Sequence, residues 1–213
     1  MTKLIFIRHG QSVANKERIF AGWYDAPLTD LGIEQAKLTG AYIAKNYKVD
    51  VVYSSDLARA EQTANEFCKI TGHKMILSEK LREIHAGEWE GNSYSVMPVK
   101  YEKEFYVWQH DIGHAVCTGG ESIKDLYARM NKFVDEILKK HQGKTIAIFS
   151  HATAIRVVTT RVLGYNYEGT TKVEWAPNAS VSVFEEKEGV ITPIILGDNS
   201  FHGEKATYLP GIV

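Results

Sequence analysis

The stretch TKLIFIRHGQS, residues 2–12, decides the fold because it joins a buried strand directly to charged and polar side chains. Residues 4–7 are apolar without alternation, which is typical of a strand buried on both faces of a parallel sheet. Arg8, His9 and Gly10 then stand at the carboxyl end of the strand, the edge where open α/β sheets bind ligands. Gly10 allows a sharp turn and the close approach of an anion. One such triplet is weak evidence of a site, but the pattern recurs.

Apolar runs alternate along the chain with segments of helical period, which indicates βα units around a parallel sheet. Thr29, Ser55 and Ser122 stand at three predicted helix starts as N-caps. We predict an α/β fold, a three-layer sandwich with a mostly parallel central sheet and helices on both faces. Further core strands are predicted at 49–53, 75–77 and 145–149, and helices at 30–46, 56–71, 122–140 and 152–163.

Two segments depart from this alternation within what we predict to be a single domain, residues 1–213. Residues 182–185 and 190–196 flank a Lys-Glu-Gly turn and predict an antiparallel hairpin at the sheet edge. Its free edge could pair with a second copy, so a homodimer is one expectation. Residues 92–118 are rich in aromatics and predict a helical insertion, either a small satellite core or a lid over the site. Residues 203–213 are either a loose tail or a cover of the pocket.

The amino-acid composition excludes some classes of binding partner. The formal net charge is −1, with 25 basic and 26 acidic residues, so we expect no binding to nucleic acid or to an anionic membrane. The N-terminal apolar run is too short for a signal segment, and no stretch approaches the roughly 20 apolar residues that cross a bilayer. Cys68 and Cys117 have no metal-type spacing. These features favour a cytoplasmic protein with reduced thiols.

The pattern of a histidine after a buried strand occurs a second time. His151 follows the strand predicted at 145–149 and precedes a helix, and Arg59 lies in the first turn after another strand. Two histidines and two arginines thus meet at one sheet edge, where helix N-termini add free N–H groups and partial positive charge. This combination predicts a phosphate pocket. The alternatives are a surface ion pair of Arg59 with Asp56 or Glu61, and helix capping by His151.

An ordered series of motifs extends along almost the whole chain: RHGQS at 8–12, FAGWYD at 20–25, PLT at 27–29, SSDLARA at 54–60, LRE at 81–83, GGES at 119–122, SHA at 150–152 and NAS at 178–180. Each fragment alone is weak evidence, whereas the series in this order is very specific. In this series the chain resembles the histidine phosphatase superfamily, in its phosphoglycerate mutase-like branch. The resemblance implies the same α/β fold.

The resemblance also implies a phosphoryl transfer in which His9 is the nucleophile and carries the group as phosphohistidine. A neutral imidazole can attack through one ring nitrogen when the other is bound to a carbonyl. Arg8, Arg59 and His151 are implied to neutralise the oxygens of the transferring group, and Asn15 to add a neutral donor. The resemblance implies no cofactor and no metal ion.

The departing oxygen needs a proton, and spacing alone leaves Glu83, Glu88 and Glu90 open as its donor. The family pattern favours Glu83. A carboxyl that burial pushes toward neutrality could act as acid in the first step and as base in the second.

Within the family, mutases return the phosphoryl group to the substrate, whereas phosphatases transfer it to water. The implied substrate-binding residues are Asn15, Gly22, Ala21 and Ala152. Ala21 stands where mutases usually have Ser or Thr, and Ala152, where many members have Gly, still supplies its N–H. The insertion offers Lys100 and Lys103 but no arginine pair of the mutase kind. We therefore favour a phosphatase acting on a small phosphorylated metabolite whose organic part is small or partly apolar. Phosphoglycerate mutase is the alternative, and broad, sugar bisphosphate and ribazole phosphatases all stay open.

Two alternative interpretations involve no phosphoryl transfer to His9. His110 and His114, with Asp111 between them, have the spacing of metal ligands, but Gly113 weakens the helix that such a site needs. A non-catalytic module that binds phosphorylated ligands predicts the loss of a pocket cation or of the acid, and all of them are present.

Overall fold

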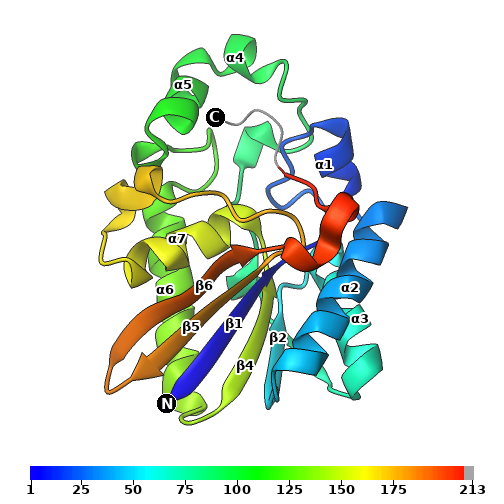
Figure 1. Ribbon diagram of the computed structural model, residues 1–213. Helices are drawn as coiled ribbons and strands as arrows, with labels where there is room; N and C mark the ends of the chain where they lie inside the picture. Colours follow the sequence, from blue (N-terminus) through cyan, green and yellow to red (C-terminus); the bar gives the residue numbers. More distant parts are fainter. Residues whose placement is uncertain (209–213) are drawn as a thin grey trace.

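The computed structural model describes residues 1–208 and shows a six-stranded sheet between helices (Figure 1). Its strands are Thr2–Arg8 (β1), Val51–Ser54 (β2), Met75–Leu77 (β3), Thr145–Ser150 (β4), Val181–Lys187 (β5) and Val190–Asp198 (β6). The order across the sheet is β3-β2-β4-β1-β5-β6. The first four strands in this order are parallel, whereas β5 is antiparallel to β1 and β6 to β5. The predicted α/β class and the edge hairpin are confirmed.

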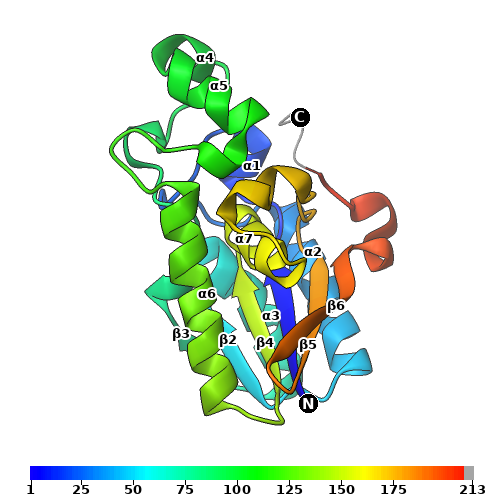
Figure 2. The same cartoon turned by 90° about the vertical axis from the view of Figure 1, so that its left-hand side faces the viewer.

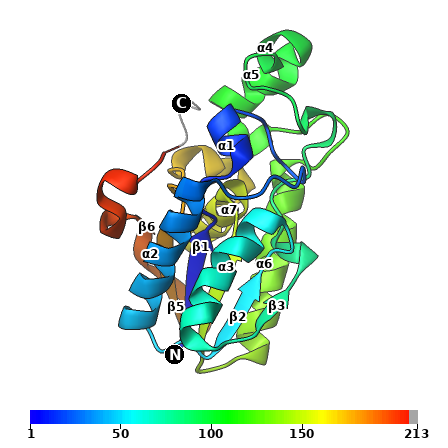
Figure 3. The ribbon, with the colours of Figure 1, turned by 90° about the vertical axis from the view of Figure 1, so that its right-hand side faces the viewer.

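Helices cover both faces of the sheet. The α-helices are Val13–Glu17 (α1), Asp30–Asn46 (α2), Ala58–Thr71 (α3), Met97–Lys100 (α4), Glu102–His110 (α5), Ile123–Lys140 (α6) and Ala152–Val162 (α7). The short 3₁₀ helices are Glu79–Leu81 (η1), Gly87–Trp89 (η2), Ile112–His114 (η3), Tyr167–Lys172 (η4) and Ser200–Lys205 (η5). Figure 2 shows α6 and α7 over one face, and Figure 3 shows α2 and α3 over the other. Among the helices of residues 1–208, none has the length and apolarity to cross a membrane.

Alternate side chains of β1 enter two separate cores. Leu4 and Phe6 pack in the cluster that contains residues of α6 and α7, whereas Ile5 and Ile7 pack with residues of α2 and α3. All four side chains are fully buried. A strand with apolar residues on both faces is what a central strand between two helical layers requires, which explains the unbroken run in the sequence.

The prediction of β3 as a core strand is wrong. Ile76 and Leu77 are 44% and 47% exposed, because β3 pairs only with β2 and forms the edge of the sheet. An apolar run of three residues does not distinguish an edge strand from a central one.

Two of the three predicted N-caps are correct. The Thr29 hydroxyl accepts a hydrogen bond from Gly32 N at the start of α2, and Ser122 forms a reciprocal capping box with Asp125 at the start of α6. Ser55 does not cap α3, which begins at Ala58 without a side-chain cap. Its hydroxyl lies instead 2.8 Å from Nε2 of His151.

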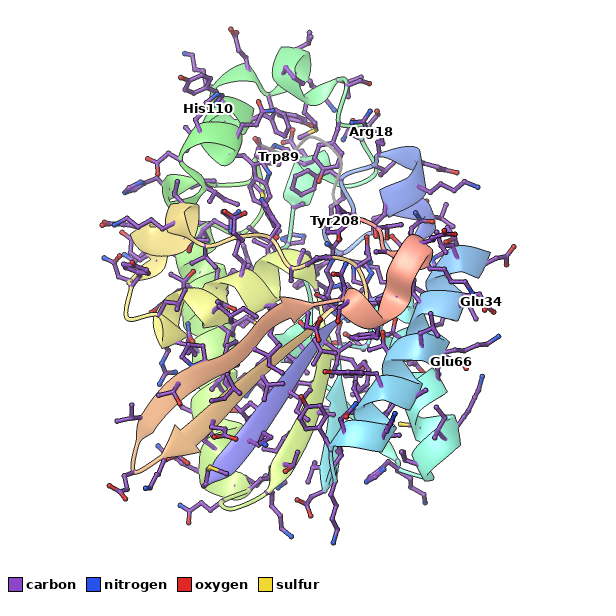
Figure 4. The ribbon with its side chains drawn as sticks, viewed as in Figure 1. Arg18, Glu34, Glu66, Trp89, His110 and Tyr208 are labelled. Atoms are coloured by element: carbon purple, nitrogen blue, oxygen red, sulfur yellow. The ribbon has the colours of Figure 1, made fainter. Side chains whose placement is uncertain are left out.

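Residues 92–118 contain α4, α5 and η3, which lie beyond the carboxyl ends of the parallel strands (Figure 1). Their aromatic side chains gather around Trp89, which is fully buried and points inward in Figure 4. The rings nearest to it, with centroids 5.3 to 5.9 Å away, belong to Phe20, Tyr101, Phe105 and Trp108. These aromatic residues belong to the same buried hydrophobic cluster as the core under α6 and α7.

The last described residues pack against the body of the protein. Gln35 on α2 donates to Lys205 O at 2.6 Å, and Asn178 N donates to Thr207 O at 3.1 Å. The remainder of the segment 203–213, residues 209–213, lies outside the described residues.

Candidate active site

His9 directly follows β1 and is fixed through its ring and its backbone. Nδ1 lies 2.7 Å from Gly10 O. A carbonyl oxygen only accepts hydrogen bonds, so Nδ1 is assigned the ring proton and Nε2 the free lone pair. The backbone N–H donates to Ser150 O at 3.1 Å, and the backbone oxygen accepts from Ala179 N at 3.0 Å. These bonds present Nε2 as the nitrogen that can attack an electrophile.

Gly10 is required here for a steric reason. A Cβ atom at this position would lie 2.4 Å from the backbone oxygen of Gly32 in α2, closer than atoms can approach. The Gly10 N–H donates to the Thr63 hydroxyl at 3.1 Å, which ties the turn to α3. The sequence suggested that Gly10 allows the close approach of an anion. In the structure, the group that approaches Gly10 closely is the backbone of α2.

Arg8 and Arg59 are each 1% exposed and reach main-chain carbonyl groups. Nη1 of Arg8 donates to Ala176 O at 2.6 Å. Arg59 donates from Nη1 to Tyr24 O at 3.0 Å and from Nη2 to Gly22 O at 2.7 Å. The Nε atom of each arginine is buried without a hydrogen-bond partner. The carbonyls orient both guanidinium groups but do not neutralise their charge.

Neither arginine forms an ion pair within residues 1–208. Asp56, which the sequence suggested as a partner of Arg59, binds Arg82 instead. The alternative interpretation, a surface ion pair between Arg59 and Asp56, is therefore wrong. Burial lowers the pKa of Arg8 and of Arg59 to about 10, although the carboxyl of Glu83 acts in the opposite direction. Both remain cationic near neutral pH, and a site with two buried cations favours an anionic ligand.

His151 lies beside His9, with ring centroids 5.2 Å apart. Its Nε2 lies 2.8 Å from the Ser55 hydroxyl and its Nδ1 is buried without a partner. It occupies the N-cap position of α7 but makes no side-chain capping bond, so the capping interpretation is wrong. Burial first, and then the charge of Arg59, hold the pKa values of both histidines well below the usual range. Both rings are therefore neutral near pH 7.

Glu83 lies in an irregular segment, yet its carboxyl group is firmly held. Oε1 accepts from Ile84 N at 2.8 Å and from Ala154 N at 3.2 Å. Oε2 accepts only from Thr153 N, at 3.0 Å. Two of these three donors belong to the first turn of α7, so the helix that follows His151 also orients Glu83.

The two other glutamates that spacing left open lie elsewhere. Glu88 is exposed, and Glu90 uses Oε1 to accept from Trp23 N and Ala86 N, both at 2.9 Å. Among the three, only Glu83 lines the pocket beside His9.

One pocket brings most of the predicted site together. His151 is not among the residues that line this pocket, although its ring centroid lies 5.2 Å from that of His9. Asn15 uses its amide oxygen to accept from Ser12 N and from the Asn178 side chain, each at 3.1 Å. The NH₂ end of Asn15 is thus the one available to a ligand. The predicted residues that line the pocket are Arg8, His9, Asn15, Ala21, Gly22, Arg59, Glu83 and Ala152.

The sequence did not identify the pocket walls. They comprise Ile19, Phe20, Ile84, Tyr94, Trp108, Thr153 and Trp175. The aromatic composition of residues 92–118 was a signal for Tyr94 and Trp108. Trp175, between η4 and β5, had no local signal, because its place in the wall depends on where the chain returns to the sheet.

The histidines with metal-type spacing lie apart from this pocket. His114 contacts Asp111, with Nδ1 and Oδ2 2.9 Å apart, and His110 stacks on Tyr106 at 4.1 Å and points outward in Figure 4. Over residues 1–208, no group of three or more His, Cys, Asp or Glu side chains is arranged to hold a metal ion.

Comparisons with known proteins agree on one family. The family model of the histidine phosphatase superfamily (branch 1) matches residues 4–198. Phosphoserine phosphatase 1 of Hydrogenobacter thermophilus is 32% identical over 196 residues, 90% of each chain. A 2,3-bisphosphoglycerate-dependent phosphoglycerate mutase of Azorhizobium caulinodans is 33% identical over 187 residues, 84% of this chain and 89% of the relative. The solved structure of Bacillus stearothermophilus YhfR is 26% identical and superposes with a TM-score of 0.89, covering 94% of this chain and 99% of that one. The chain therefore belongs to the histidine phosphatase superfamily, in its branch 1.

Proposed function

We propose that this enzyme is a metal-independent phosphatase that hydrolyses small phosphomonoesters through a phosphohistidine on His9. The observation that carries the proposal is the His9 ring, whose Nδ1 is bound to a carbonyl and whose Nε2 is free in a pocket with two buried cations. The guanidinium groups of Arg8 and Arg59 supply positive charge of the kind that many phosphoryl-transfer enzymes take from a metal ion.

In the first step, Nε2 of His9 attacks the phosphorus and the bond between phosphorus and the ester oxygen breaks. Arg8, Arg59 and the partnerless Nδ1 of His151 stabilise the oxygens of the transferring group. Oε2 of Glu83 accepts only one N–H bond, so it can carry the proton that passes to the departing oxygen. The products are the free alcohol and the phosphorylated ring.

In the second step, water attacks the phosphorus and the bond to Nε2 of His9 breaks. The Glu83 carboxylate, which lost its proton in the first step, takes one from the attacking water. Inorganic phosphate leaves, and the neutral imidazole and protonated Glu83 are restored. Both steps use the same pair of residues in opposite directions.

The pocket walls support a phosphatase rather than a mutase. Beyond Arg8 and Arg59, the described wall is mostly apolar and offers no further cation for a second phosphate. Lys100 is exposed and places Nζ over the Tyr101 ring, 5.0 Å from its centroid, and Lys103 is exposed as well. We therefore propose a substrate with a partly apolar organic group. We also propose that residues 92–118 serve as its lid, since Tyr94 and Trp108 line the pocket.

We further propose that the protein acts in the cytoplasm and pairs with a second copy through β6. The unpaired state of Cys68 and Cys117 supports the first proposal. Exposed apolar residues on the edge strand, Val190, Ile194 and Leu196, support the second. Light scattering coupled to gel filtration measures the mass in solution, and a monomer at micromolar concentration would contradict pairing.

Phosphorus NMR tests the reaction directly. The wild type and His9→Ala are incubated with a chelator and with phosphoserine, p-nitrophenyl phosphate, or 3-phosphoglycerate containing a trace of 2,3-bisphosphoglycerate. His110→Ala, which changes an exposed histidine on α5, is the matched control. We expect inorganic phosphate from the wild type and the control but not from His9→Ala.

Three outcomes would contradict the proposal. A new phosphoglycerate isomer without free phosphate would mean a mutase. Activity lost in chelator and restored by a divalent cation would mean a metal enzyme. Undiminished turnover by His9→Ala would remove His9 as the nucleophile.

A further inference from the structure

Glu83 occupies a part of the chain that has no regular structure to hold it. Residues 82–86 join η1 to η2 without helix or strand. A group that transfers a proton must stay within hydrogen-bond reach of one atom, and a displacement of 1 Å can lower a rate by about 10²-fold. The backbone of this segment therefore needs support from elsewhere in the fold.

Arg129 on α6 supplies that support with every N–H it has. Nη1 donates to Lys80 O at 2.9 Å and to Arg82 O at 3.0 Å. Nη2 donates to Glu83 O at 3.1 Å and to Oε2 of Glu121 at 2.8 Å, while Nε donates to Oε1 of Glu121 at 2.9 Å. A guanidinium group has five N–H bonds, so its donor capacity is fully used.

Glu121 extends the same network to the other side of Glu83. Its Oε2 also accepts from His85 N at 2.8 Å, and its own N–H donates to His85 O at 2.8 Å. Trp23 Nε1 donates to Glu83 O at 2.8 Å. The main chain is thus held before, at and after Glu83 by side chains from two distant segments and by the loop at 119–122.

We propose that Arg129 and Glu121 are positioning residues that hold the Glu83 carboxyl where it can pass its proton to the departing oxygen. Neither residue lines the pocket, so the role proposed for each is to position Glu83 and not to contact the substrate. The inference rests on the proposed role of Glu83 as the acid. It accounts for the GGES motif, residues 119–122, which the chemistry at His9 leaves unexplained.

A comparison of two phosphate esters distinguishes a role of Arg129 and Glu121 in positioning the acid from a role in general structural support. p-Nitrophenolate departs without a proton, whereas the alkoxide of an alkyl ester such as phosphoserine requires one. The parameter to compare is kcat/KM, which covers the steps up to transfer of the phosphoryl group to His9. A defect in proton donation lowers it for the alkyl ester far more than for the aryl ester.

Arg129→Lys is the informative variant. Lysine keeps the positive charge, which contributes to lowering the pKa of His151, but its ammonium has three donors and no planar fork. We expect kcat/KM for phosphoserine to fall about 10²-fold and that for p-nitrophenyl phosphate to change by less than about threefold. Glu121→Gln, which keeps the shape of the side chain, should show a smaller change in the same direction.

Arg161→Lys is the matched control. Arg161 joins α7 to α6 through Asn131 O at 3.2 Å and Asp135 at 2.7 Å, without contacting the Glu83 segment. It should leave the ratio of the two kcat/KM values unchanged. Thermal melting checks that each variant is folded, and if Arg129→Lys is not, the Glu121→Gln ratio decides.

Glu83→Gln distinguishes a failure of this inference from a failure of the proposed function. We expect it to lower kcat/KM for phosphoserine by about 10²- to 10⁴-fold and to affect the aryl ester less. If Glu83→Gln is selective while Arg129→Lys affects both esters equally or neither, the positioning role is overturned and the acid stands. If Glu83→Gln itself does not discriminate, the acid role falls and the positioning role falls with it.

Discussion

Replacing His151 by glutamine should make the fold less sensitive to acid. Its pKa in the native protein is well below the usual value, because the ring is fully buried and close to Arg59. When the pH falls below about 6.5, the unfolded chain binds a proton at this histidine and the native protein does not. The unfolded state then holds more protons, so the free energy of unfolding decreases as the pH decreases. A histidine that stays neutral in the native state removes about 2 kcal/mol between pH 7 and pH 5.

Urea unfolding, followed by tryptophan fluorescence between pH 7 and pH 5, measures this loss. Glutamine can keep a hydrogen bond to Ser55 but cannot bind the proton. We expect the loss of unfolding free energy over this range to be smaller in His151→Gln than in the wild type by about 2 kcal/mol. The buffer must contain no phosphate, because a bound anion would stabilise the charged ring. His110→Gln, at an exposed position, should behave as the wild type does. An unchanged pH dependence in His151→Gln would refute the assignment of a neutral, buried ring.

Three further predictions address packing, substrate contact and capping. Gly10→Ala should lower the melting temperature and reduce kcat by about 10²-fold, because the new Cβ meets Gly32 O and displaces His9. Calorimetry measures the melting temperature and steady-state kinetics measure kcat. Wild-type values of both would contradict the close approach of Gly32 O to Gly10. Trp175→Leu should raise KM for an aryl phosphate more than it lowers kcat, since it removes a pocket wall and no reacting group; a lower kcat at constant KM would place Trp175 in the chemistry. Ser122→Ala should decrease the unfolding free energy by about 1 kcal/mol through loss of the capping box, which urea unfolding checks, and an unchanged unfolding free energy would contradict the cap.

Patterns that depend on neighbouring residues were sufficient to predict much of the fold. The unbroken apolar run before Arg8 implies a central strand, and Thr29 and Ser122 mark helix starts by caps that act within three residues. The site residues at strand ends could be found for the same reason. The fold places the carboxyl ends of β1 and β4 side by side, which brings His9 next to His151.

Features that depend on distant partners could not be predicted. Ser55 looked like a cap, but its hydroxyl is engaged by His151, nearly a hundred residues away in sequence. β3 is exposed because no further strand pairs with it, which three apolar residues do not reveal. Trp175 and Arg129 belong to no recognisable motif. Their positions depend on how the segment between η4 and β5 and helix α6 pack against the rest of the fold.

The place of β1 in the sheet has a consequence for biosynthesis. β1 is made before both of its neighbours in the sheet, because β4 at residues 145–150 and β5 at residues 181–187 follow it by well over a hundred residues. At 5–20 residues per second, the hydrophobic segment at 4–7 waits about 10 to 40 s for both of its neighbours. During that time it is a target for chaperones and for aggregation, and a nascent chain that ends before Ala179 lacks one partner of the bonds that fix the His9 backbone.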